Sequence, residues 1–214
     1  MKYPRDLLGY GQNLPKVTWP NSAKIAIQFV INYEEGGENC LLHGDPSSEA
    51  FLSEIVGAEP WLGKRHYNME SIYDYGARSG FWRLHNLFNS ENIPVTIFGV
   101  ATALAKSPVQ VNAMQLAEWE IASHGYKWID YKNFSKKKEK NFLQKAIKLH
   151  TAATGLPPKG WYLGRCTENT VALASEFGSF EYISDSYDDD LPYWIKPKKI
   201  PQLIIPYTLD ARSE

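Results

Sequence analysis

Several ionisable side chains of this sequence stand directly after short apolar segments, where they could act together on a bound molecule. They are Glu34 and Glu35, His124, Arg165, the acids Asp185, Asp188, Asp189 and Asp190, and Tyr207 with Asp210. Carboxylates and imidazoles exchange protons in catalysis, and a guanidinium can hold a planar amide or carboxylate. Together these residue types indicate an enzyme rather than a structural protein.

Each of these residues also has a structural interpretation. Adjacent acids such as Glu34 and Glu35 often lie in a solvated turn, and their side chains point opposite ways in an extended chain, so at most one is expected to face a substrate. The glycines that follow favour a functional turn, because they let a ligand or a second backbone approach closely. His124 could merely cap a turn, and Arg165 could pair with a buried carboxylate. The acids at 188–190 are typical of a solvated loop.

The histidines do not follow the spacing of a catalytic zinc site. Such sites commonly use two histidines and a carboxylate, and an HxxxH pattern supplies both histidines together. Four residues after His124 the chain has Trp128, so Glu35 with His124 gives two ligands. The remaining histidines stand alone in predicted loops or helices: His43, His66, His85 and His150. The sequence therefore predicts no metal and no other cofactor.

Strands and helices alternate along the chain in a way that could position the ionisable residues. The mainly apolar segment 24–32 is typical of a strand buried on both faces of a parallel sheet. Further strands are predicted at 95–100, 120–123, 160–162, 181–184 and 203–205, and helices at 81–88, around Leu104, and at 111–119, 135–155 and 169–177. An arm at 1–23 and a long irregular loop at 39–79 complete the organisation.

This alternation predicts an α/β protein with a parallel sheet, either a barrel or a doubly wound sheet, in a single domain over 1–214. The carboxyl ends of parallel strands lie at one end of the sheet, where active sites form. The acids, His124 and Arg165 are therefore expected at one end. Trp128, Trp161 and Trp194 are expected in the core first and in a pocket wall second.

The composition excludes several other classes of protein. The chain has 214 residues with 23 Lys and Arg against 24 Asp and Glu, so nothing in the charge balance indicates nucleic-acid binding. Two cysteines are too few for a disulfide scaffold, and Cys166 as a nucleophile would need an adjacent base. No signal peptide or membrane-length apolar stretch is present in the sequence. We expect a cytoplasmic protein that does not bind membranes.

A set of motifs along the whole chain closely resembles one enzyme family. The motifs are Asn32-Tyr33-Glu34-Glu35-Gly36-Gly37-Glu38, Met69-Glu70-Ser71-Ile72-Tyr73-Asp74-Tyr75-Gly76, Gly80-Phe81-Trp82-Arg83-Leu84, Ile93-Pro94-Val95-Thr96, Glu120-Ile121-Ala122-Ser123-His124-Gly125, Trp128-Ile129-Asp130-Tyr131, Gly160-Trp161-Tyr162 with Gly164-Arg165, Asp188-Asp189-Asp190-Leu191-Pro192-Tyr193-Trp194 and Pro206-Tyr207-Thr208-Leu209-Asp210. They resemble the cofactor-independent allantoinases, a branch of the polysaccharide deacetylase, or NodB-homology, superfamily.

The resemblance implies a distorted (β/α) barrel that hydrolyses an amide C–N bond. Sugar deacetylases of this superfamily hold a metal with an Asp-Asp pair and an HxxxH motif, and these positions correspond here to Glu34-Glu35 and to His124 with Trp128. Trp in place of the second histidine is what the allantoinase branch shows. The implied substrate is the ureide allantoin, a purine-catabolism compound whose hydantoin ring is opened to allantoate, and the family suggests a homo-oligomer.

The resemblance also implies roles for individual residues. Water attacks a ring carbonyl, Glu35 or else Glu34 takes its proton, His124 polarises the carbonyl or protonates the leaving nitrogen, and Arg165 orients the ureido group. Substrate contacts are expected from five aromatic or acidic residues: Tyr33, Trp128, Trp161, Asp190 and Tyr207.

Some positions depart from the family pattern. Lys127, Trp119 and Cys166 replace the usual residues, and family chains continue after the segment 206–210, so the barrel is expected to be incomplete at its C-terminus. Two alternatives to an allantoinase therefore stay open. One is a carbohydrate N-deacetylase of the same superfamily, and the other is a truncated, inactive paralogue.

Overall fold

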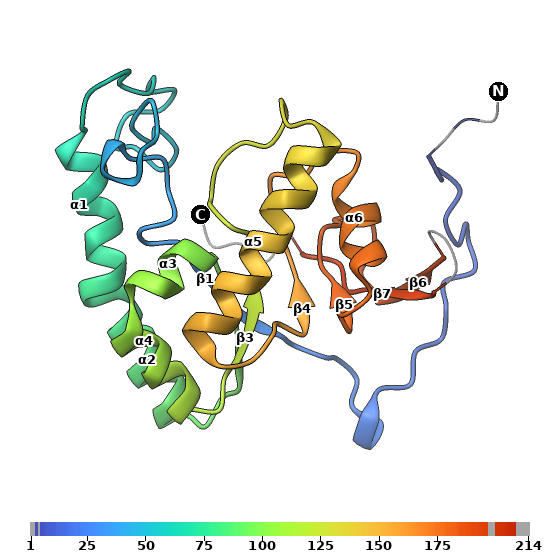
Figure 1. Ribbon diagram of the computed structural model, residues 1–214. Helices are drawn as coiled ribbons and strands as arrows, with labels where there is room; N and C mark the ends of the chain where they lie inside the picture. The colour runs from blue at the N-terminus through green and yellow to red at the C-terminus, as the bar shows by residue number, and fades with distance from the viewer. Residues whose placement is uncertain (1–2, 4, 197–199, 209–214) are drawn as a thin grey trace.

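A twisted, mostly parallel sheet organises the computed structural model, which describes residues 3, 5–196 and 200–208 (Figure 1). The strands are β1 (Phe29–Tyr33), β2 (Val95–Gly99), β3 (Glu120–Ser123), β4 (Gly160–Trp161), β5 (Tyr182–Ile183), β6 (Tyr193–Ile195) and β7 (Gln202–Ile204). Their order in the sheet is β1-β2-β3-β4-β5-β7-β6, and β6 alone of these strands runs antiparallel to its neighbour. The predicted α/β class with a parallel sheet is confirmed.

Helices cover the sheet in two groups, which lie side by side in Figure 1. They are α1 (Tyr67–Tyr75), α2 (Phe81–Ser90), α3 (Ala101–Lys106), α4 (Pro108–Leu116), α5 (Lys136–Thr154) and α6 (Thr170–Phe177), with the short 3-10 helices η1 (Pro20–Ser22) and η2 (Leu41–His43) and the π-helical segment η3 (Gly76–Gly80) between α1 and α2. One core cluster packs β1 and β2 against α1 to α4, and a second packs the later strands against α5 and α6. A third cluster includes Phe98 and Tyr162, whose side chains leave the sheet on its other face.

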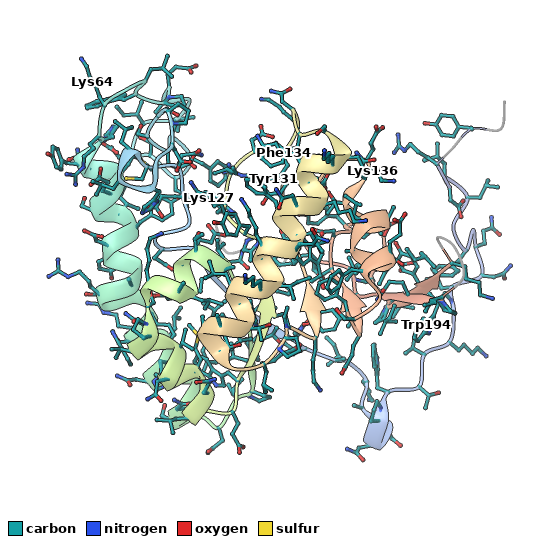
Figure 2. The ribbon with its side chains drawn as sticks, viewed as in Figure 1. Lys64, Lys127, Tyr131, Phe134, Lys136 and Trp194 are labelled. Atoms are coloured by element: carbon teal, nitrogen blue, oxygen red, sulfur yellow. The ribbon has the colours of Figure 1, made fainter. Side chains whose placement is uncertain are left out.

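Helix α5 forms where its end signals and its apolar spacing predict a helix. The side chain of Ser135 accepts a hydrogen bond from the backbone N–H of Lys138, and Gly155 ends the helix in the left-handed conformation. Leu143, Ala146 and His150 are buried at a spacing of three to four residues. Lys136 stands at the exposed start of the helix (Figure 2), as expected for the basic run.

The first strand is shorter than the sequence predicts. Residues 24–28 lie outside the ladder, because the register pairs Phe29 with Val95, the first residue of β2. Without a neighbouring strand, Ile25 and Ile27 are exposed, and residues 5–28 form an extended arm interrupted by η1 (Figure 1).

Three other local expectations differ from the structure. The interval 39–79 contains helix α1, whose buried face consists of Met69 and Tyr73, so its apolar signal is sparse. Strand β6 was not expected, since Tyr193–Ile195 is a short edge strand that pairs with β7 alone. On β6, Trp194 is 66% exposed, so the expectation that this ring lies in the core was wrong (Figure 2).

The end of β1 separates the two adjacent acids. Glu35 turns toward the junction of α1 and η3, where its carboxylate also accepts a hydrogen bond from the backbone N–H of Glu34 at 3.0 Å. A Cβ atom on Gly76 would lie 2.1 Å from Oε1 of Glu35, so this glycine provides the space for the carboxylate. Burial, together with the nearby charges of Glu34 and Glu38, raises the pKa of Glu35 to about 7.

Within the described part of the chain, no helix combines the length and the apolar character needed to cross a bilayer.

We predict that Gly76→Ala destabilises the protein by about 1–3 kcal/mol, because the new methyl group displaces the Glu35 side chain. Gly80→Ala is the matched control. Both glycines have helical backbone angles, but a Cβ on Gly80 meets no atom closer than 3.7 Å. The control should be neutral or stabilising by up to about 1 kcal/mol. Chemical denaturation measures both values, and equal losses in the two variants would contradict the packing argument.

We predict that Glu35 makes the protein less stable as the pH rises from 5 to 8. Its folded-state pKa of about 7 lies above the ordinary value of 4.5, so the folded state binds this proton more tightly than the unfolded state does. The stabilisation is complete below about pH 4.5 and is lost as the pH rises through 7, by about 2–3 kcal/mol.

The measurement compares the free energy of unfolding of the wild type and Glu35→Gln at pH 5 and at pH 8. The variant should gain stability relative to the wild type as the pH rises. A difference between the two proteins that is independent of pH would show that Glu35 does not titrate in this range.

Candidate active site

Parallel pairing brings the ends of five strands, β1 to β5, to the same level. The backbone N–H of His124 donates to the carbonyl of Gly99 at 2.8 Å, and that of Tyr162 donates to Ser123 at 2.9 Å. The same pattern joins Ser184 to the carbonyl of Trp161, and Val100 to the carbonyl of Tyr33 at the end of β1. The residues that follow β1, β3, β4 and β5 therefore gather at one end of the sheet, as the sequence predicts.

Glu34 and His124 form the centre of this end of the sheet. Nε2 of His124 lies 3.1 Å from Oε1 of Glu34, although the two residues are 90 positions apart in the chain. The imidazole is 1% exposed and the carboxylate 12% exposed. Nδ1 of His124 lies 3.2 Å from the carbonyl oxygen of Tyr162. Because a carbonyl can only accept, Nδ1 carries a hydrogen, and one proton is shared between Nε2 and Glu34.

The structure separates Glu35 from this pair, since its carboxylate lies against Gly76. The two glycines after the acids serve the packing of the chain itself. Gly36 has a positive φ of 93°, and a Cβ on Gly37 would lie 2.5 Å from a methyl carbon of Val100. The tight turn at the end of β1 therefore aims the two carboxylates in different directions.

A stack of aromatic rings leads from His124 to Tyr207. The imidazole lies 4.9 Å from the ring of Tyr162, and Tyr162 stacks on Tyr207 at 4.8 Å with an angle of 8° between the planes. Phe98 contacts both tyrosine rings from the end of β2. Tyr207 thus reaches the neighbourhood of His124, whereas Tyr162 was not among the residues predicted for the site.

Asp185 is an acid at the end of β5 that supports the same region. Its Oδ1 accepts hydrogen bonds from the backbone N–H groups of Leu163 at 2.8 Å and Gly164 at 2.9 Å. Burial raises the pKa of this carboxyl, against the lowering effect of its hydrogen bonds with Cys166, Gly164 and Leu163. Through these bonds Asp185 holds the loop 163–164 in place. This loop passes close to His124, since a Cβ on Gly164 would lie 3.3 Å from Cε1 of the imidazole.

Arg165 and Trp128 form a cation–π pair beside an open hollow. The guanidinium carbon lies 3.8 Å from the centre of the indole and 5.3 Å from the ring of Phe51. The hollow has a volume of about 450 Å³ and is lined by Glu49, Phe51, Asp130, Arg165 and Cys166. Its lining combines a planar cation, carboxylates and an aromatic ring, which suits a small polar molecule.

Two residues of this hollow, Glu49 and Phe51, were not predicted from the sequence. The carboxylate of Glu49 is buried and accepts hydrogen bonds from the side chain of Asn39 at 2.8 Å and from the backbone N–H groups of Ala50 and Phe51 at 3.0 Å each. Both lie in the interval 39–79, where no periodic pattern distinguishes a site residue from a loop residue.

The side chains of the remaining predicted site residues pack elsewhere or are exposed. Tyr33 is 1% exposed and packs edge-on against Phe81, and Trp161 is 2% exposed and packs against Phe180. Asp190 is exposed. Asp210 lies outside the described residues.

The donor atoms at this site do not match the superfamily's metal centre. Glu34 and His124 offer two ligand atoms, but Trp128 stands where the second histidine would be, and an indole has no lone pair to donate. The Arg165 cation over that indole would also repel a metal ion. No step of the reaction is therefore assigned to a metal at this position.

Comparisons with known proteins agree on one family. The sequence profile described as polysaccharide deacetylase matches residues 68–179. A Schizosaccharomyces pombe protein, named provisionally as a polysaccharide deacetylase, is 38% identical over 228 residues, which cover 98% of this chain and 71% of that protein.

Two solved structures share more than half of their aligned residues with this chain. The crystal structure of PuuE allantoinase is 52% identical with a TM-score of 0.94, covering 98% of this chain and 70% of the other. A probable polysaccharide deacetylase from Pseudomonas aeruginosa PAO1 is 53% identical with a TM-score of 0.93, covering 97% and 70%. From the profile match, the shared sequence and the shared fold, the chain belongs to the polysaccharide deacetylase family.

Proposed function

We propose that this member of a hydrolase family is an allantoinase, which opens the hydantoin ring of allantoin to allantoate without a metal. The observation that carries the proposal is the buried Glu34–His124 pair, together with the Arg165–Trp128 cation–π pair at the sequence position where the superfamily pattern has the second histidine. The 52% identity to PuuE allantoinase across 98% of the chain supports the same conclusion.

The pair can move the protons that ring opening requires. A water molecule attacks a ring carbonyl, and its proton passes to the Glu34–His124 pair as the new C–O bond forms. The ring C–N bond then breaks, and the pair returns a proton to the leaving nitrogen. The hydrogen bond from Nδ1 to the Tyr162 carbonyl leaves Nε2 as the nitrogen that exchanges protons.

The two acids have different parts in this proposal. Glu34 takes the proton, because its carboxylate reaches His124, and Glu35 is a positioning residue that accepts the backbone N–H of Glu34. The geometry thus supports the second of the two bases that the sequence left open. The pKa of about 7 at Glu35 reflects its burial and does not require contact with substrate.

Arg165 and the hollow beside it suit a ureide. A guanidinium donates parallel hydrogen bonds to planar carbonyl groups, and the stacking on Trp128 holds its plane in one orientation. Asp130 and Cys166 complete the rim of the hollow, and Cys166 is exposed. A small planar molecule with several N–H and C=O groups could bind there through polar contacts.

A carbohydrate N-deacetylase is the second candidate. Two of the similar proteins, from Schizosaccharomyces pombe and Pseudomonas aeruginosa, are named as polysaccharide deacetylases. Both reactions hydrolyse an amide C–N bond, so the same proton-transferring pair would serve either substrate.

We predict that the purified protein converts allantoin to allantoate in the presence of a chelator. Product formation is followed directly, and acetate release from N-acetylated sugar oligomers is measured in parallel. Acetate release without allantoate formation would replace the allantoinase proposal with the deacetylase. A folded protein that is inactive on both substrates would support the inactive paralogue.

We predict that Glu34→Gln lowers kcat by about 10²- to 10⁴-fold with a small change in KM, because the amide cannot accept the proton. Lys136→Gln, at the exposed start of α5, is the control and should keep wild-type turnover. Circular dichroism verifies that both variants fold. Wild-type kcat in Glu34→Gln would exclude this residue as the base.

A further inference from the structure

The turn after the active-site acids brings together three side chains of different metal-ligating chemistry. Glu38, Cys40 and His43 each place a potential ligand atom within 4.8 Å of the others. Glu38 and Cys40 are buried, and His43 is half-buried. The expectation that His43 stands alone was therefore wrong, because η2 folds the chain back on itself and brings His43 to Glu38 and Cys40. The spacing of these three residues in the sequence matches no common zinc motif, so the sequence did not indicate the cluster.

Hydrogen bonds within the turn hold these residues before any ion is bound. The Glu38 carboxylate accepts from the backbone N–H of Gly36 at 2.7 Å, and Asp45 accepts from the backbone N–H of Cys40 at 3.0 Å. Asp45 also pairs with Lys127 from the segment after β3. A loop fixed in this way loses little freedom when a ligand binds.

His43 has the second contact that metal-binding histidines usually have. Its Nδ1 lies 3.2 Å from the backbone carbonyl of Glu38, so Nδ1 carries the hydrogen in the neutral ring. The lone pair is then on Nε2, which becomes the nitrogen able to bind a metal. Such a hydrogen bond to a carbonyl fixes the tautomer and the orientation of a metal-binding imidazole.

The Glu38 carboxylate is buried without a direct ion pair among the described residues. Glu38 is 6% exposed, and within residues 3, 5–196 and 200–208 no Lys or Arg nitrogen lies within 4.0 Å of its carboxylate. The Cys40 thiol lies 3.6 Å from Glu70, but Arg65 already pairs with that carboxylate through two hydrogen bonds. Lys106 is the nearby cation, since its Nζ donates to the carbonyl of Gly36 at 2.6 Å, but it forms no direct ion pair with Glu38.

We propose that Glu38, Cys40 and His43 bind a divalent zinc ion, with water in the fourth position. A thiolate, an imidazole and a carboxylate suit Zn²⁺, whereas Mg²⁺ and Ca²⁺ prefer oxygen ligands alone. Ligand atoms in a tetrahedral zinc site lie about 3.3–3.8 Å apart, so each ligand atom has to move by about 1 Å, through a change of side-chain rotamer, to form the site. On binding, the Cys40 thiol releases its proton to solvent and the thiolate coordinates the ion.

The proposed ion would stabilise the turn and takes no part in the proposed hydrolysis. The turn connects Glu34 to the segment that carries Glu49 and Phe51, and the carbonyl of Gly37 accepts the backbone N–H of Trp128 at 2.9 Å. Zinc here would fix the loop that lines the hollow.

The test is a titration of the metal-free protein with Co²⁺ as a spectroscopic probe for zinc. We expect a thiolate-to-cobalt charge-transfer band that saturates at about one equivalent and disappears when Zn²⁺ is added. Cys40→Ser should abolish the band, and His43→Gln should weaken binding by more than about 100-fold. Cys166→Ser is the matched control and should keep the band.

The absence of a band in the wild type, or a band that survives Cys40→Ser, would overturn the proposal. The titration is independent of catalysis, so Glu34→Gln should bind Co²⁺ like the wild type. Repeating the chelator assay in Cys40→Ser, which cannot bind metal at the turn, separates a failure of this proposal from a failure of the proposed function.

Discussion

The proton shared between Glu34 and His124 is the interaction on which the rest of the site depends. It joins residues that follow β1 and β3, two strands that are separated by β2 in the sheet. The contact at 3.1 Å exists because the ladders on both sides of β2 hold the two strand ends level. Burial of the imidazole keeps water from competing for the proton, so a small shift of either strand would weaken the pair.

The loops around the pair are held by contacts that limit their movement. Tyr162 supplies the carbonyl that fixes the imidazole tautomer, and Asp185 binds the backbone that follows it. Burial of Glu35 raises its pKa, so its charged form is destabilised in the folded protein. This is an energetic cost of the turn that directs Glu34 toward His124. The site therefore combines one reactive pair with several residues whose contribution is to position it.

Membership of the polysaccharide deacetylase family gives the fold, and in the proposed function the replacement of a metal ligand by Trp128 decides the chemistry. Trp128 changes the charge as well as the coordination of the site, because it recruits the Arg165 guanidinium to its ring face. A position that carries a metal cation in the superfamily pattern thus lies beside an organic cation here. A guanidinium can bind a carbonyl group in a fixed orientation without activating a water molecule itself, so the proposed function assigns the proton transfers to Glu34 and His124.

The sequence by itself determined the α/β class, the buried strand β2, the capped helix α5 and the gathering of Glu34, His124 and Arg165 at the strand ends. These features depend on local periodicity, on end signals and on the rule that parallel strands point the same way. The sequence also indicated both adjacent acids, Glu34 and Glu35, as candidates, and the extended chain predicted that their side chains point in different directions.

Only the tertiary structure decided which acid meets His124, because that depends on the space left by Gly76 across the turn. It also decided that Ile25 and Ile27 lie outside the ladder, that Glu49 and Phe51 line the hollow, and that Glu38, Cys40 and His43 meet. In each case the partner is distant in sequence or lies in an irregular turn. Periodicity carries no information on such contacts, because it reports one face of a regular element and not what packs against it.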